Sequence, residues 1–126
     1  MKAHFKNTVL NYQPIVEAIL QNPSNGKSLG IELIVDTGFQ GGVLIPLRTY
    51  LSLGLNLHEE PKVIAKSAVG GEVELRVSRV MVKIGNTNVS CRAYTALNVR
   101  KSLLGREVLK ELGFLYNPPE TLKAGL

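Results

Sequence analysis

IVDTG, the sequence of residues 34–38, ends an apolar segment with an acid, a hydroxyl and a glycine. The two apolar residues are expected to bury the end of a strand, so that Asp36 stands where the chain turns. Thr37 can fix this turn through its hydroxyl group, and Gly38 allows a backbone conformation that a side chain would exclude. The segment therefore predicts a rigid, partly buried carboxylate directed at a cleft, as the tuning of a reactive acid requires.

The rest of the chain is dominated by the period-two alternation of β-strands. Strands are expected at residues 14–20, 29–35, 43–45, 63–67, 72–78, 80–84, 89–93 and 114–116. Short helices are expected at residues 47–53 and 106–112, each ended by a glycine. This order predicts a mainly β protein, a small closed or partly closed β-barrel with two short helices. One domain covering residues 1–126 is the simplest organisation.

Composition and charge exclude several classes of function. The net charge is +5, but the basic residues are scattered and aromatics make up only 6%, which disfavours nucleic-acid binding. No apolar run approaches the roughly 20 residues that span a bilayer, and no signal peptide is expected, so we expect a cytoplasmic protein without membrane contact. His4 and His58 are isolated, and Cys91 alternates along a strand, so neither a metal site nor a cofactor is expected.

Three features in this order resemble the retropepsin-like aspartic proteases, which include the retroviral proteases and their cellular relatives. The active-site loop of small prokaryotic members is matched by Asp36-Thr37-Gly38-Phe39, and the start of the C-terminal helix by Leu103-Leu104-Gly105-Arg106. Between them, residues 67–72 match the glycine-tipped hairpin that forms the flap. The resemblance covers about residues 12–116 and implies a barrel of the retropepsin type, with one lobe per chain.

The resemblance also implies which residues act. Asp36, Thr37 and Gly38 would be the catalytic triplet. The implied substrate-binding residues are Phe39, Gln40, Val69, Gly70 and Gly71.

A second carboxylate is needed for this chemistry, because two carboxyl groups share one proton and act on a bound water. Asp36 is the only aspartate of the chain, so the second one would come from a copy related by a two-fold axis. We therefore expect a homodimeric aspartic endopeptidase that acts on peptide or protein substrates. Two alternatives stay open: a retropepsin-fold module that dimerises or binds peptides without cleaving them, and Asp36 as an ordinary turn residue.

The sequence departs from the family pattern beside the triplet. Phe39 stands where a small residue is common, and it predicts an apolar wall next to the catalytic pair. Gln40 stands where retroviral members have an aspartate that pairs with the helix arginine, so Arg106 is expected to lack that partner. Glu59 and Glu60 are expected in a solvated loop rather than in a catalytic pair.

Overall fold

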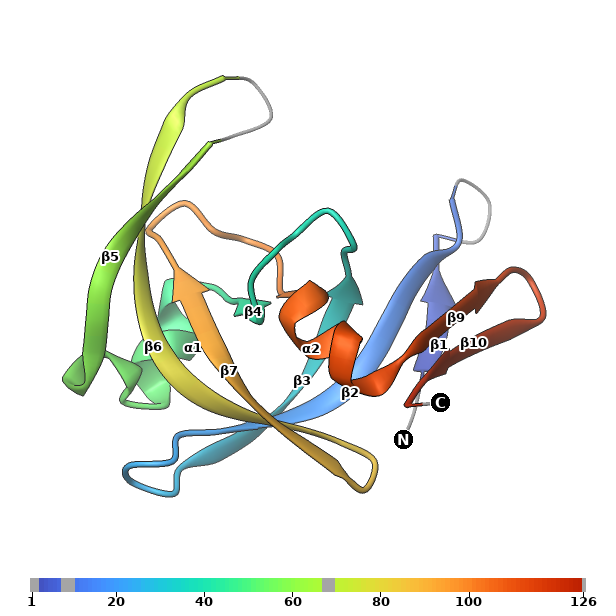
Figure 1. Cartoon of the computed structure of the whole chain (residues 1–126), viewed down its shortest axis with the longest axis horizontal. Coiled ribbons are helices and arrows are strands. Elements are labelled where there is room, and N and C mark those ends of the chain that lie inside the picture. Colours follow the sequence, from blue (N-terminus) through green and yellow to red (C-terminus); the bar gives the residue numbers. More distant parts are fainter. Residues whose placement is uncertain (1–2, 8–10, 67–69, 126) are drawn as a thin grey trace.

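The computed structural model describes residues 3–7, 11–66 and 70–125, and it is mainly β with two short helices (Figure 1). This confirms the predicted fold class. The strands are β1 (Ala3–Lys6), β2 (Gln13–Gln21), β3 (Ser28–Val35), β4 (Val43–Leu44), β5 (Glu59–Lys66), β6 (Glu72–Ile84), β7 (Thr87–Thr95), β8 (Leu103–Leu104), β9 (Phe114–Asn117) and β10 (Thr121–Ala124). The helices are α1 (Leu47–Ser52) and α2 (Arg106–Leu112), and a 3-10 turn, η1 (Leu55–Leu57), follows α1.

The main sheet closes on itself. Its hydrogen-bonded order is β1-β2-β3-β8-β4-β7-β6-β5, and β2 also pairs with β6. The strands from β2 to β6 in this order therefore form a closed ring, with β1 and β5 attached outside it. The β3–β8 and β4–β7 pairs are parallel, and this parallel pairing brings segments that are distant in the sequence side by side.

Period-two alternation explains how the ring is filled. Leu33, Val43, Val80, Cys91 and Leu104 come from different strands, and all five are buried in one core cluster. Closing the ring gives these strands a common interior, whereas their polar neighbours in the sequence face outward. Cys91 is thus buried, as the sequence predicted.

Strand β6 is one continuous strand, whereas two strands, 72–78 and 80–84, were expected. Its alternation changes phase where Val77 and Ser78 are both buried, and this looked like a break in the sequence. The Ser78 hydroxyl donates to the carbonyl oxygen of His58 at 2.8 Å, which allows a polar side chain at a buried position. Beyond this point β6 leaves β5 and pairs with β2, thereby closing the ring.

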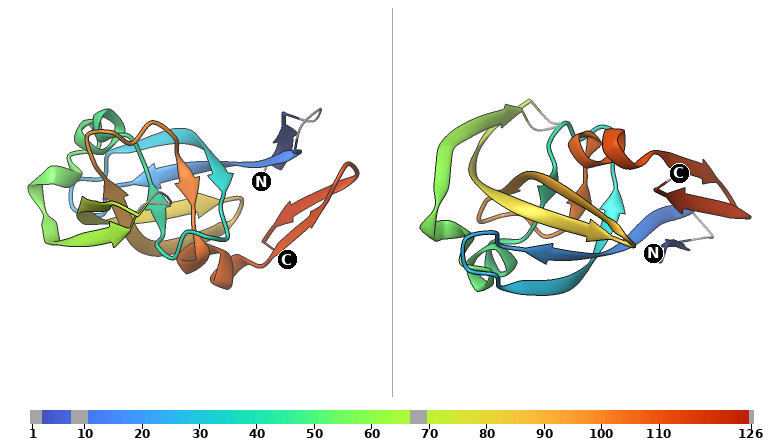
Figure 2. Two further views of the ribbon diagram at one scale, coloured as in Figure 1. Left: turned by 90° about the horizontal axis from the view of Figure 1, so that it is seen from above. Right: turned by 60° about the horizontal axis from the view of Figure 1, so that its bottom comes forward.

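Both ends of the chain form strands that the sequence did not predict. Strand β1 pairs with β2, and β10 pairs with β9 in a separate hairpin. Figures 1 and 2 show this hairpin beside β1, extending away from the ring. The Tyr116 hydroxyl donates to the carbonyl oxygens of Asn11 and Tyr12 at 3.0 Å, and its ring packs edge-on against Phe5. The two ends of the chain thus stabilise each other.

Candidate functional site

The Asp36 carboxylate lies in a tight loop directly after β3. The amide of Asp36 donates to the carbonyl oxygen of Leu104 at 2.9 Å, which ties the loop to β8. The amide of Gly38 donates to Asp36 Oδ1 at 2.9 Å, and that of Phe39 donates to the Asp36 carbonyl oxygen at 3.1 Å. One carboxylate oxygen is therefore held by the backbone of its own turn, and the half-buried side chain is fixed in orientation.

The start of α2 holds the other side of this loop. The amides of Gly105, Arg106 and Glu107 donate to the carbonyl oxygens of Gly42, Phe39 and Gly41, at 2.8, 2.9 and 3.2 Å. A Cβ atom on Gly105 would overlap the Gly41 carbonyl oxygen and lie 2.6 Å from Cδ2 of Phe39. The loop can approach the helix this closely only because position 105 has no side chain.

A cleft of about 450 Å³, whose larger side chains are mostly apolar, separates the loop from β5. Phe39 packs edge-on against Tyr94 from β7, with ring centroids 5.7 Å apart, and both rings line the cleft. The opposite side is formed by residues 63–66 of β5 together with Leu75 of β6. The lining thus combines apolar side chains with the polar groups of Gln40 and Lys66.

A search of solved structures finds the same arrangement of strands in proteases. A retropepsin-like aspartic protease from Rickettsia conorii matches with a TM-score of 0.68 at 20% identity, over 92% of this chain and 83% of that chain. EIAV protease, in complex with the inhibitor HBY-793, matches with a TM-score of 0.59 at 24% identity, over 82% of this chain and 91% of that chain.

The chain has the retropepsin fold. The resemblance stated from the loop, the hairpin and the helix motif is thus confirmed for the fold. No protein-family model matches the sequence, and no curated protein does either. The similarity to these proteases is therefore detected in the tertiary structure and not in a comparison of the whole sequence.

The loop after β3 brings several of the predicted site residues together. Asp36, Thr37 and Gly38 share one turn, and Gly38, Phe39 and Gln40 line the cleft. Val69 lies outside the described residues. Gly70 and Gly71 are exposed at the far end of the β5–β6 hairpin and do not line the cleft, and Gly70 has a φ of +91° that favours glycine.

Other residues of this cleft were not predicted from the sequence. Val63, Ile64, Leu75 and Tyr94 line it, although each was read only as part of an alternating strand. Val63 and Ile64 are unusually exposed for large apolar side chains, at 38% and 59%. The sequence contained one signal of this site. Val63 and Ile64 are adjacent, so their side chains point to opposite faces of the strand, and a strand with one buried face needs an apolar residue at only one of these positions.

An ion-pair cluster lies at the base of the hairpin, where a solvated loop was expected. Glu59 lies on β5 and accepts hydrogen bonds from Arg76 Nε at 2.8 Å and from the Tyr50 hydroxyl at 2.7 Å. Glu60 pairs with Arg79 and Arg92 at 3.1 and 3.0 Å. Burial alone would raise the pKa of Glu59, but the hydrogen bonds from Arg76 and Tyr50 outweigh it and lower that pKa. The cluster therefore fixes the root of the hairpin rather than forming a catalytic pair.

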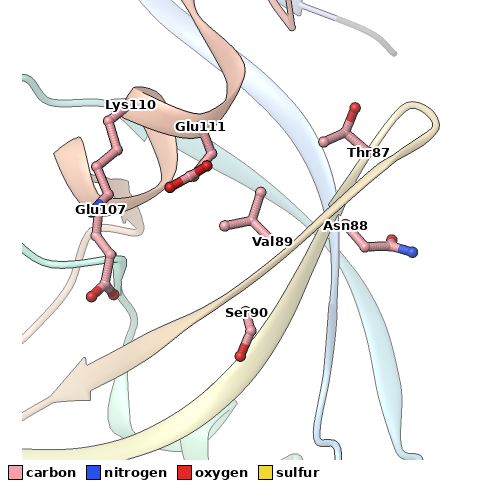
Figure 3. Close-up of a pocket in the computed structure, with 7 residues that line it drawn as sticks. All are labelled: Thr87, Asn88, Val89, Ser90, Glu107, Lys110 and Glu111. Carbon is pink, nitrogen blue, oxygen red and sulfur yellow. The ribbon is translucent and has the colours of Figure 1, made fainter.

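A second pocket, of about 390 Å³, lies between the start of β7 and α2 (Figure 3). It is lined by polar groups that include Glu107, Lys110 and Glu111, and by no residue of the Asp36 loop or of the hairpin.

Across the described residues, no group of histidine, cysteine and acidic side chains is arranged to hold a metal ion. Among those same residues, no helix has the length and apolar character needed to cross a bilayer.

Proposed function

We propose that the protein is a homodimeric aspartic endopeptidase whose active site contains two Asp36 carboxylates, one from each subunit. The observation that carries this proposal is the position of the only aspartate in the chain. Asp36 lies in the retropepsin loop, two residues before the segment that lines an apolar cleft. A homodimer is proposed because the chemistry needs a second carboxylate, and a two-fold axis beside Asp36 would supply it.

In the proposed mechanism the two carboxyl groups share one proton. The ionised carboxylate accepts a proton from a bound water, whose oxygen attacks the carbonyl carbon of the scissile peptide bond. The protonated carboxyl group donates its proton to the carbonyl oxygen, which gives a tetrahedral diol. The diol collapses with cleavage of the C–N bond: the first carboxyl group gives the proton that it took from water to the leaving nitrogen, and a hydroxyl group of the diol returns a proton to the second carboxylate, which restores the shared-proton pair. The backbone hydrogen bond from Gly38 to Asp36 Oδ1 supports this role by fixing the carboxylate.

The β5–β6 hairpin is proposed to act as the flap over the bound peptide. Its strands pair from Glu59 opposite Ser78 to Lys66 opposite Glu72, and residues 63–66 already form one wall of the cleft. Its root is held by the Glu59 and Glu60 ion pairs, whereas a side chain at Gly70 would contact nothing within 4 Å. A hairpin whose root is fixed is suited to open and close over substrate.

Asp36→Asn tests the proposal, because it keeps the size of the side chain and removes its charge. We expect peptide hydrolysis to be abolished, while the solution mass stays that of a dimer. Glu32→Gln is the matched control, since it removes an acid of the adjoining strand β3 that bonds only exposed basic groups, and it is expected to cleave normally. A transition-state mimic of the aspartic-protease type should inhibit the wild type.

Cleavage by the Asp36→Asn protein would exclude the proposed mechanism. A stable monomer at high concentration would exclude the proposed assembly. A dimer that binds peptides, but does not cleave them in either form, would favour the non-proteolytic module.

A further inference from the structure

A basic pocket adjoins the apolar cleft. It has a volume of about 330 Å³ and is lined by Gln40, Arg106, Glu107 and Lys110. Gln40 also lines the cleft, so the two hollows share one wall. A peptide lying in the cleft could therefore extend a side chain past Gln40 into this pocket.

The basic groups of this pocket are available to a ligand. Arg106 and Lys110 are exposed, and neither forms an ion pair within the described part of the chain. Glu107, the acidic residue of the pocket, has Oε1 bound to the amide of Arg92 at 2.8 Å, which directs it toward β7. Lys66 at the β5 side of the cleft is likewise exposed and without an ion pair among these residues.

The position of the pocket is fixed relative to the Asp36 loop. The amide of Arg106 donates a hydrogen bond to the carbonyl oxygen of Phe39 at 2.9 Å. The amide of Glu107 donates one to the carbonyl oxygen of Gly41 at 3.2 Å. The helix turn that carries Arg106 and Lys110 is thereby attached to both sides of Gln40. The backbone of this turn is therefore fixed relative to the cleft, and the distance from its charged groups to the cleft varies only through motion of the side chains.

We infer that the protein selects peptides in which an apolar residue is flanked by an acidic residue. The apolar side chain occupies the cleft between Phe39 and β5, and the neighbouring carboxylate binds Arg106 and Lys110 across Gln40. No acidic residue lines the described part of the cleft, and the one acid of the pocket, Glu107, has its Oε1 bound to the amide of Arg92. The inference rests on the proposed function in that a peptide is taken as the ligand, and it adds the class of sequence recognised.

The test measures binding separately from cleavage. Fluorescently labelled peptides share one apolar core and carry Glu, Gln or Lys at each position flanking it, and their affinity for the Asp36→Asn protein is measured by anisotropy. We expect the best Glu peptide to bind about fivefold more tightly than its Gln counterpart at low salt, as two exposed charge pairs allow. The preference should shrink in high salt because the charges are screened.

Two double variants, each built in the Asp36→Asn protein, identify the residues responsible. Arg106→Gln with Lys110→Gln should remove the Glu preference and leave the affinity for the Gln peptide unchanged. The control, Lys27→Gln with Lys83→Gln, lowers the net charge equally at exposed positions outside the cleft and the pocket, and it should keep the preference. This control separates a local pocket from the general attraction of a basic protein for acidic peptides.

The outcomes separate the inference from the proposed function. Loss of the preference in both double variants, equal affinity for Glu and Gln peptides, or binding of none of the peptides would overturn the inference. A Glu preference that depends on Arg106 and Lys110 would uphold it, even if the wild type cleaved nothing and the peptidase proposal failed. Cleavage by the wild type without any charge preference would uphold the peptidase proposal alone.

Discussion

Gly105→Ala is expected to destabilise the protein because the added methyl group has no space. The Cβ atom would overlap the carbonyl oxygen of Gly41 and lie 2.8 Å from that of Phe39. Van der Waals contact requires roughly 3.4 Å or more, so the Phe39 carbonyl oxygen would have to retreat by about 0.6 Å and the closer Gly41 carbonyl oxygen by about 1 Å or more. The backbone itself is not strained by alanine, because Gly105 has an extended φ of −104°.

The expected loss follows from what this retreat disturbs. Three backbone hydrogen bonds join residues 105–107 to the loop, and each contributes on the order of 1 kcal/mol. Together with the cost of overpacking, Gly105→Ala should lower the free energy of unfolding by about 2–4 kcal/mol. Hydrolysis should also fall, since the same bonds position the loop that carries Asp36.

Urea unfolding at one fixed protein concentration measures this effect, because dimerisation would make stability depend on concentration. Gly30→Ala on β3 is the matched control, since a Cβ atom there meets nothing within 4 Å. It should raise the free energy of unfolding by about 0.5–1 kcal/mol rather than lower it, because alanine loses less backbone entropy than glycine inside a strand. If the two variants were equally stable, the close approach of loop and helix would not be a constraint on the fold.

Three further predictions concern single groups. Thr95→Val should lower the free energy of unfolding by about 1–2 kcal/mol, measured by urea unfolding, because the buried hydroxyl donates to the Ile45 carbonyl oxygen at 2.7 Å. The hydrogen bond from Arg92 lowers the pKa of Glu60 below its ordinary value of 4.5, so the stability that Glu60 contributes is present above pH 4.5 and is lost as the pH falls through the folded pKa. Glu60→Gln should therefore destabilise the protein at pH 7 and make little difference near pH 3, and an equal effect at both would contradict this. Burial raises the pKa of the Cys91 thiol to about 12, so a thiol reagent at pH 8 should label the denatured protein and leave the native one unlabelled.

Local patterns were sufficient for most of the strands of the ring and for the triplet. The alternation in residues 29–35 and 89–93 follows from one buried face, and a sequence shows this without knowledge of the partner strand. Asp36-Thr37-Gly38 and Gly105 could be recognised because they match motifs of the retropepsin-like family. The backbone conformation expected to require glycine at position 38 is not found, since Gly38 has no positive φ, and the close packing that excludes a side chain at Gly105 is visible only in the folded chain. The sequence determined which residues form the loop.

The tertiary structure decided how these pieces meet. Pairing of β3 with β8 and of β4 with β7 joins residues some 50 to 70 positions apart, and local periodicity carries no information about such partners. The same long-range pairing places Tyr94 against Phe39 in the cleft. It also gives the glutamates of β5 their arginine partners, which sequence neighbours could not reveal.

The ends of the chain and the basic pocket likewise depend on contacts that only the tertiary structure provides. Strands β1 and β10 form because each finds a partner strand and aromatic contacts, and neither has a strong pattern of its own. The sequence showed that Arg106 lacks the usual acidic partner beside it, since Gln40 occupies that position. Only the folded chain brings Lys110 to the same pocket and joins it to the cleft, because the hydrogen bonds that attach α2 to the loop connect segments more than 60 residues apart.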